Sequence, residues 1–201
     1  MPHSPKQKQD TRERILESAR RLFNNKGFFD VSIEAVMTDA GLTHGGFYRH
    51  FGSKDELFAE SVRHFMCKTT PDPWQAKQAA LNPEKPRAQR IVDAYFSRDH
   101  FDDRESCCPL LATASDASRG GDSVKAAYRQ VAEKLVEIFE AHLSENEGRE
   151  RALALLALLA LCVGGMVLAR GVDDPDLADA FRSAAHREAL KTVGAGGAGA
   201  R

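Results

Sequence analysis

The chain has 201 residues, of which 42% are hydrophobic and 28% are charged, and its formal net charge is -1. This length and composition suit one compact domain, or a small domain joined to a larger one, with enough apolar residues for a real core. The near-neutral charge excludes a polycation that would bind nucleic acid through its overall charge. The N-terminal region is locally basic, with seven lysines and arginines against three acidic residues in positions 1–26. Such a distribution is typical of nucleic-acid-binding arms and equally of solvated tails.

The cysteines and the N-terminus bear on the compartment. Cys67, Cys107, Cys108 and Cys162 lack zinc-type or CxxC spacing. The opening stretch MPHSPKQKQDTRER has no apolar region of the kind that a secretory signal contains. We therefore expect a cytoplasmic protein whose thiols are free, with no metal and no cofactor.

One uncharged stretch of 18 residues, Ala152 to Ala169, reaches the lower limit of transmembrane length. Alanine and glycine supply many of its positions, so its hydrophobicity is moderate for a membrane span. The alternative is a helix that is apolar all round because protein surrounds it on every side. We favour this alternative and expect no membrane partner.

Helical periodicity runs through almost the whole chain, and no alternating strand is convincing, so we expect an all-α fold. Asp10 with Glu13 is interpreted as the N-terminal cap of the first helix, and Gly27 as its end. Ser32, Thr43 and Ser53 are interpreted as the caps of the next three helices. The predicted helices are 11–26, 33–40, 43–50, 54–68, 85–100, 106–118, 122–146, 149–170 and 175–192.

Helix 33–40, the Gly41-Leu42 turn and helix 43–50 have the proportions of a helix-turn-helix, whose second helix enters the major groove of DNA. Gly45 and Gly46 lie at the start of that second helix, where each glycine costs about 1 kcal/mol of helix stability relative to alanine. We interpret them as bare backbone that lets the helix approach base edges closely. The alternative is a helix start that merely tolerates glycine.

The side chains around the two glycines suit contacts with DNA. Phe47 and Phe51, four residues apart, predict an inner face, which leaves the intervening polar side chains pointing outward. Lys54 begins the next helix, whose N-terminal dipole favours a phosphate. His44 is the side chain best placed to reach a base edge. The predicted DNA-binding residues are Ser32, Thr43, His44, Gly45, Gly46, Tyr48, Arg49, His50 and Lys54.

The segment Thr11–Phe58 resembles the N-terminal domain of the tetracycline-repressor (TetR) family of bacterial transcriptional regulators. The resemblance implies that Thr43, Tyr48, His50 and Lys54 bind phosphates, whereas His44 and Gly45 face bases. At His44 and Gly46 the chain departs from many relatives, which carry other polar or basic side chains there. The family pattern is matched at Ile15, Ala19, Phe23, Gly27, Ala40, Gly41, Thr43, Phe47, Tyr48, His50, Phe51, Lys54, Glu56 and Leu57.

The same resemblance implies a division into three regions: a DNA-binding domain over 1–68, a ligand-sensing and dimerisation domain over 69–192, and a disordered tail over 193–201. Helices 149–170 and 175–192 would pack against their copies in a homodimer. Two-fold symmetry then requires a roughly palindromic operator in double-stranded DNA. A small-molecule effector would release the DNA, which makes the chain a ligand-responsive regulator and most simply a repressor.

The effector site is chosen only from large or polarizable residues of the sensor region, each of which could equally be plain core. The candidates are Trp74, Phe96, Cys107, Tyr128, Phe139 and Met166. A second hypothesis makes Cys107 or Cys108 a thiol sensor of oxidants or electrophiles. Residues 105–117 resemble a Cys-Pro-Leu element of one branch of TetR-like regulators, which implies that Cys108 begins a helix whose dipole would favour a thiolate. The chain shows no phosphate loop, metal cluster or catalytic triad, so we expect no enzyme.

Overall fold

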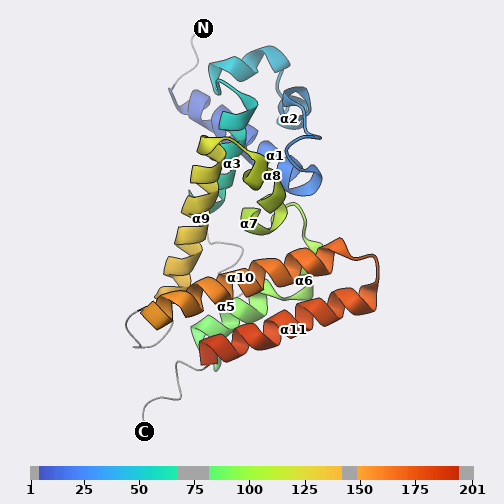
Figure 1. Ribbon diagram of the computed structural model, residues 1–201. Coiled ribbons are helices and arrows are strands. Elements are labelled where there is room, and N and C mark those ends of the chain that lie inside the picture. Colours follow the sequence, from blue (N-terminus) through green and yellow to red (C-terminus); the bar gives the residue numbers. More distant parts are fainter. Residues whose placement is uncertain (1–4, 68–81, 142–148, 195–201) are drawn as a thin grey trace. The chain divides into compact units, whose positions relative to one another are not determined.

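The computed structural model describes residues 5–67, 82–141 and 149–194. The regular elements of these residues are all helical, which confirms the all-α class (Figure 1). In chain order they are α1 (Pro5–Lys26), α2 (Ile33–Asp39), the 3-10 helix η1 (His44–Arg49), α3 (Lys54–Cys67), α5 (Arg87–Tyr95), α6 (Arg98–Asp102), α7 (Pro109–Ala112), α8 (Ala114–Arg119), α9 (Asp122–Glu140), α10 (Arg149–Gly171) and α11 (Pro175–Gly194).

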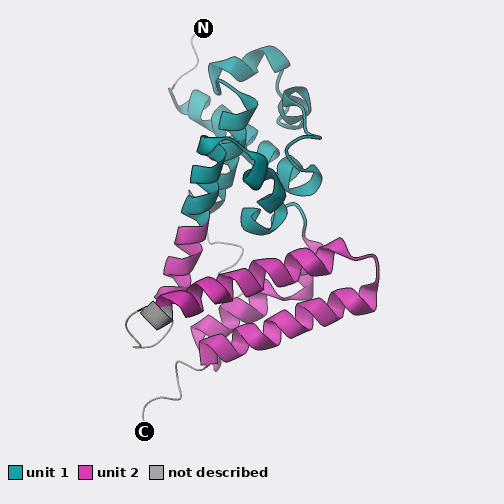
Figure 2. Cartoon of the chain, in the orientation of Figure 1, with its two compact units in different colours: residues 1–67, 104–131 teal, residues 68–103, 132–201 magenta. Residues whose placement is uncertain are grey.

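The chain divides into two compact units (Figure 2). Unit 1 comprises residues 1–67 and 104–131, and unit 2 comprises 68–103 and 132–201. The segment 104–131 therefore packs with the N-terminal helices, although it follows the proline-rich stretch in the sequence. The sensing and dimerising role of residues 69–192 stays a prediction, and residues 195–201 of the expected tail lie outside the described ranges.

The core of unit 1 forms where α1 packs on α2, α3 and α7, and α2 packs on η1. Ile15, Ala19 and Phe23, three of the four apolar residues at helical spacing in the first helix, are buried, and Leu22, the fourth, is half-buried. The predicted inner face of the helix-turn-helix is also buried, since the rings of Phe47 and Phe51 stack with their centroids 5.8 Å apart. Every one of these side chains lies on the helical spacing that the sequence predicted.

Most of the predicted helix ends are confirmed. Gly27 ends α1 with φ +79°, and Gly41 forms the next turn with φ +67°, a region that favours glycine. The Ser32 hydroxyl accepts a hydrogen bond from the amide of Ala35 at 3.0 Å, as an N-cap does. The Asp10–Glu13 cap is wrong, because the polar residues before Thr11 continue the helix back to Pro5.

Three predicted helices are shorter or divided. Helix 85–100 is interrupted at Phe96–Ser97, where the Ser97 hydroxyl accepts a hydrogen bond from the amide of His100 and begins α6. Helix 106–118 begins only at Pro109 and is divided at Thr113, which ends α7. Helix 122–146 ends at Glu140 as α9, and residues 142–148 lie outside the described ranges.

In unit 2, α10 and α11 run side by side in opposite directions (Figure 1), and α11 also packs on α5. Gly165 permits their close approach, since a Cβ at this position would lie 2.3 Å from the Cβ of Ala185. Cys162 and Met166, which are both buried, lie on the same side of α10. These contacts cover only one side of the helix.

The segment Ala152–Gly171 is long and apolar enough to cross a membrane, and 28% of its most apolar window is buried within the chain. By itself this is weak evidence for a span, because a helix of a soluble protein meets the same criteria. The expectation that protein surrounds the helix on every side is not met within one chain. Its opposite face stays exposed, including Leu153, Leu156 and Leu168.

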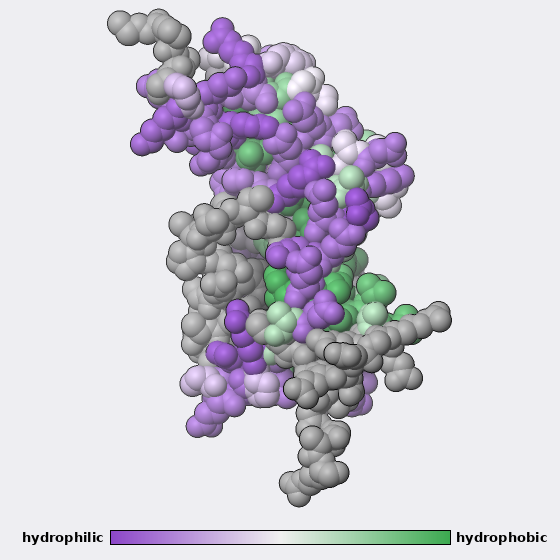
Figure 3. Space-filling view, turned by 90° about the vertical axis from the view of Figure 1, so that its left-hand side faces the viewer, coloured by the Kyte–Doolittle hydropathy of each residue, from purple (hydrophilic) through white to green (hydrophobic). Residues whose placement is uncertain are grey.

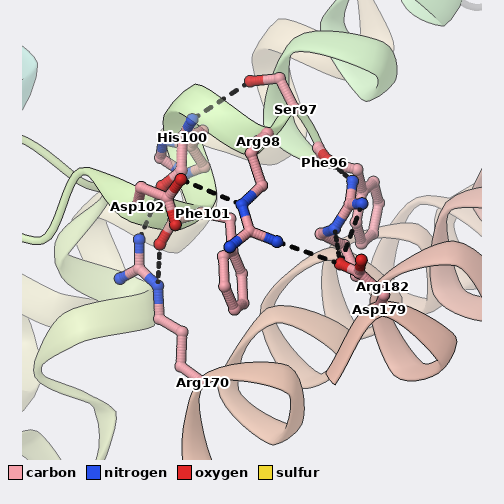
Figure 4. Close-up of polar contacts among 9 residues, drawn as sticks. All are labelled: Phe96, Ser97, Arg98, His100, Phe101, Asp102, Arg170, Asp179 and Arg182. Carbon is pink, nitrogen blue, oxygen red and sulfur yellow. Dashed lines mark hydrogen bonds and ion pairs between the residues drawn. The ribbon is translucent and has the colours of Figure 1, made fainter. Parts of the chain in front are cut away.

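Arginines from α10 and α11 hold the segment around α6 (Figure 4). Arg170 donates hydrogen bonds to the carbonyl oxygens of His100, Phe101 and Asp103 at 2.6, 3.0 and 3.0 Å. These carbonyls lie at the C-terminal end of α6, where intrahelical partners run out. Arg182 donates in the same way to the carbonyl of Phe96 at 2.6 Å. The short α6 is therefore held mainly by side chains from other helices.

Candidate nucleic-acid interface and effector residues

The predicted helix-turn-helix is formed by α2, the turn at Gly41 and η1. The turn is closed by two hydrogen bonds, from the amide of Gly41 to the carbonyl of Thr38 at 2.9 Å and from Leu42 to Met37 at 2.8 Å. The second helix differs from the prediction, since residues 44–49 form a 3-10 helix rather than an α-helix over 43–50. The two adjacent glycines explain this difference, because glycine is a poor α-helix former.

Thr43 occupies the N-cap position of η1 with an extended backbone, but its side chain makes no capping hydrogen bond. This part of the capping prediction is wrong. The consequence is that the exposed Thr43 hydroxyl is not used by the helix end and can bind a phosphate oxygen.

The nine predicted DNA-binding residues all belong to unit 1, and most of them are open to solvent. Tyr48 is 65% exposed, although its ring contacts Phe47 edge-on at 5.1 Å. Gly46, His50 and Lys54 are half-buried. The remaining exposed residues are Ser32, Thr43, His44, Gly45 and Arg49.

Neither the backbone conformation nor the packing of unit 1 requires glycine at these two positions. Neither has a positive φ. A Cβ on Gly45 would meet no atom within 4 Å, and one on Gly46 would lie 3.6 Å from the Met37 methyl carbon, an ordinary contact. The packing of unit 1 therefore accepts alanine at both positions and does not require the glycines.

Lys54 begins α3 as predicted, next to a capping box. The Ser53 hydroxyl accepts a hydrogen bond from the amide of Glu56 at 3.0 Å, and the Glu56 carboxylate accepts one from the amide of Gly52 at 2.7 Å. The Lys54 ammonium lies 4.3 Å from the centre of the Phe28 ring. Burial lowers the pKa of Lys54, although Asp55, Asp116 and Asp30 act in the opposite direction.

Two arginines of α1 support the interface and were not identified from the sequence. Arg14 donates a hydrogen bond to the carbonyl of Ala40 at 2.5 Å, directly at the helix-turn-helix turn. Arg12 pairs with Glu60 of α3 and lies 4.2 Å from the centre of the Phe51 ring. Sequence spacing indicates that these arginines leave the inner face of α1, but it does not indicate which neighbouring helix they contact.

The predicted effector residues that the structure describes are divided between the two units. Phe96, Phe139 and Met166 are buried in unit 2, whereas Cys107 and Tyr128 belong to unit 1. The Tyr128 hydroxyl donates a hydrogen bond to the carbonyl of Leu110 at 2.8 Å, and burial raises the pKa of Tyr128 to about 12. Trp74 lies outside the described residues.

Burial opposes the predicted activation of the thiol at Cys108. This residue precedes the four-residue helix α7, and hydrogen bonds from the amides of Leu110 and Leu111 favour the thiolate. Burial outweighs them and raises the pKa of Cys108 to about 12. Cys107 is also buried, and its thiol donates to the carbonyl of Arg104 at 3.1 Å. Buried thiols of this kind are poor nucleophiles at neutral pH.

A cavity of about 140 Å³ lies in unit 1 beside the turn between α1 and α2. None of the five predicted effector residues that the structure describes lines it. Its walls combine aromatic rings with carboxylates and a guanidinium group. The lining residues are Phe28, Phe29, Asp55, Phe58, Asp116, Arg119, Gly120, Gly121 and Val124.

Comparison with known proteins agrees with this geometry. Residues 15–61 match the family model described as bacterial regulatory proteins, tetR family. The chain is 26% identical over 172 residues to the HTH-type transcriptional regulator BetI of Brucella melitensis, covering 85% of each protein. It is also 26% identical over 154 residues to the HTH-type regulator YerO of Bacillus subtilis, covering 75% of this chain but only about half, 52%, of YerO.

A solved structure extends the likeness of the fold beyond the helix-turn-helix. The reduced form of E. coli NemR superposes with a TM-score of 0.67 at 18% identity, covering 90% of this chain and 95% of NemR. The relatives in sequence are regulators rather than enzymes, and the DNA-binding helices lie where the family model matches. The chain therefore carries, over residues 15–61, the DNA-binding domain of the TetR family of transcriptional regulators.

Proposed function

We propose that this chain is a cytoplasmic, homodimeric repressor that binds a palindromic operator and releases it when a small molecule binds. The observation that carries the DNA-binding part is the pair Gly45 and Gly46. Gly45 is exposed and Gly46 is half-buried, packing requires neither glycine, and both lie next to the exposed side chains of His44, Tyr48 and Arg49. Bare backbone at the leading end of a recognition helix lets it approach base edges, while the neighbouring polar groups bind phosphates.

The exposed face of α10 supports the dimer. Leu153 and Leu156 are each 56% exposed and Leu168 is 53% exposed. With Ala157, Ala160 and Val167 they recur at helical spacings of three, four and seven, which puts them on one side of the helix. Figure 3 shows hydrophobic surface (green) gathered on unit 2. An apolar face of this kind suits burial against the same face of a second copy, and a membrane is not needed to cover it.

Unit 2 also supplies the proposed effector site, among the buried apolar residues Phe96, Phe139 and Met166. A pocket there would bind a largely apolar molecule with a few polar groups. Release of DNA follows if the effector prefers a conformation in which the two recognition segments are wrongly spaced. The buried, weakly acidic thiol of Cys108 does not favour the thiol-sensor alternative.

The experiment is selection from a random DNA pool at a fixed salt concentration, with the mass of the complex measured by light scattering. We expect a palindromic winner bound by two chains, with half-sites separated by about one helical turn of 34–36 Å or a multiple. The recovered duplex then serves as the probe for compounds that release it. If no sequence outcompetes random DNA, or if one chain saturates the winner, the proposal is wrong.

A further inference from the structure

The segment 104–131 contributes one carboxylate to the turn between α1 and α2. Asp116, on α8, is 9% exposed. Its Oδ2 atom accepts a hydrogen bond from the backbone amide of Phe28 at 3.0 Å. The same oxygen would lie 3.3 Å from a Cβ on Gly27, whose φ of +79° already disfavours a side chain. Asp116 thus satisfies the backbone donor of Phe28 next to the end of α1.

The turn that Asp116 holds carries the ring against which Lys54 lies. The Phe28 ring packs on the rings of Phe58 and Phe23, with centroids 5.0 and 5.9 Å apart. Its face is 4.3 Å from the Lys54 ammonium. A cation over an aromatic face is attracted by the ring quadrupole. The position of the ammonium therefore depends on the position of Phe28, whose backbone depends on Asp116.

We propose that Asp116 is a positioning residue for DNA binding, which places the Lys54 ammonium through the Phe28 turn. The proposal rests on the proposed role of Lys54 as a phosphate contact. A lysine that is already held loses less side-chain freedom when it binds a phosphate than one that moves freely. Arg119 is paired with the other carboxylate oxygen, Oδ1, at 3.6 Å, which leaves Oδ2 facing the Phe28 amide.

The test is a double-mutant cycle on the affinity for DNA, with the duplex recovered by selection and a mixed-sequence duplex at about 50 mM salt as probes. Asp116→Ala is expected to weaken binding about tenfold in the wild-type background and less than twofold in Lys54→Ala. Asp116→Asn keeps an oxygen that can accept from the Phe28 amide and should restore binding to within about threefold. A residue that only stabilised the fold would give additive effects in this cycle.

Asp30→Asn is the matched control, because the Asp30 carboxylate also acts on the charge of Lys54 but is exposed to solvent. Its effect on affinity should be less than twofold. If Asp116→Ala unfolds, Phe28→Leu replaces it, since leucine keeps the backbone bond and removes the ring; it should weaken binding and be non-additive with Lys54→Ala.

Two results separate the possible failures. If Lys54→Ala binds both duplexes as the wild type does, the proposed phosphate contact is wrong. If Lys54→Ala weakens binding but Asp116→Ala does not, or if the two losses add fully, the contact stands and the positioning role of Asp116 is overturned.

Discussion

At Gly45 and Gly46, the residue that favours stability differs from the residue that favours DNA binding. The 3-10 geometry of η1 and the open space around Gly45 allow the fold to accept a methyl group at this position. In a regulator that approaches base edges through this backbone, the same methyl group would hinder the contact with DNA. Because packing does not require the glycines, their effect on stability and their effect on DNA binding can be measured separately.

Gly45→Ala is expected to leave the free energy of unfolding unchanged or raise it by up to about 1 kcal/mol. The same variant should weaken binding to the selected operator by at least about tenfold, the scale of one lost base contact. Urea unfolding and fluorescence anisotropy measure the two quantities. Gly41→Ala is the control. Because the φ of Gly41 is +67°, this substitution should lower the free energy of unfolding by about 1–2 kcal/mol. Wild-type affinity in Gly45→Ala would contradict the interpretation of the glycines.

The buried thiol of Cys108 predicts a dependence of stability on pH. An unfolded cysteine ionises from about pH 9, whereas the folded thiol does so only near pH 12. In this window the folded state holds a proton that the unfolded state has lost, so the free energy of unfolding falls as pH rises. Urea unfolding at pH 8 and about pH 10 should show a smaller fall in Cys108→Ala than in the wild type. An equal fall in both proteins would show that Cys108 is not protected in this way.

At the scale of an element, α6 has few residues and ends on carbonyls that other helices satisfy. Arg170 supplies three of these hydrogen bonds from α10. Arg98 lies in the same view, but its ion pairs with Asp102 and Asp179 join side chains that are at least half exposed (Figure 4). Substitutions of Arg170 and Arg98 therefore probe the same region, but we expect them to change the free energy of unfolding by very different amounts.

Arg170→Met should lower the free energy of unfolding by about 2 kcal/mol or more, since it leaves partly buried carbonyls without their charged donor. Arg98→Met should change it by less than about 1 kcal/mol, as exposed ion pairs contribute little. Chemical unfolding followed by circular dichroism compares the two. Equal losses would mean that α6 is not held by the Arg170 hydrogen bonds.

At the scale of the whole molecule, the apolar side of α10 stays exposed to solvent in a single chain. Leu156→Glu with Leu168→Glu introduces two charges into the proposed interface, where charged residues are disfavoured. We expect a helical monomer in sedimentation that no longer distinguishes the palindrome from a single half-site. Lys125→Glu, on the exposed side of α9, is the control and should remain dimeric. A double variant that stays dimeric would place the interface elsewhere.

The sequence by itself determined the all-α class, the helix-turn-helix and its inner face. These features follow from local rules: apolar residues at helical spacing bury Ile15, Ala19 and Phe23, and glycine is favoured where φ is positive, at Gly27 and Gly41. Ser32 and Ser53 were correct as caps for the same reason, because a cap acts on an amide only three residues away.

Only the tertiary structure decided which distant residues meet. Asp116 reaches Phe28 across 88 positions of the chain, and Arg14 reaches Ala40 across 26, at spacings that carry no periodic signal. The acidity of Cys108 depends in the same way on burial, which no local pattern around α7 indicates. The local pattern identified the buried helix faces and the caps Ser32 and Ser53, although it failed at Asp10 and Thr43. It was insufficient wherever solvent exclusion or a partner from another element sets the energy.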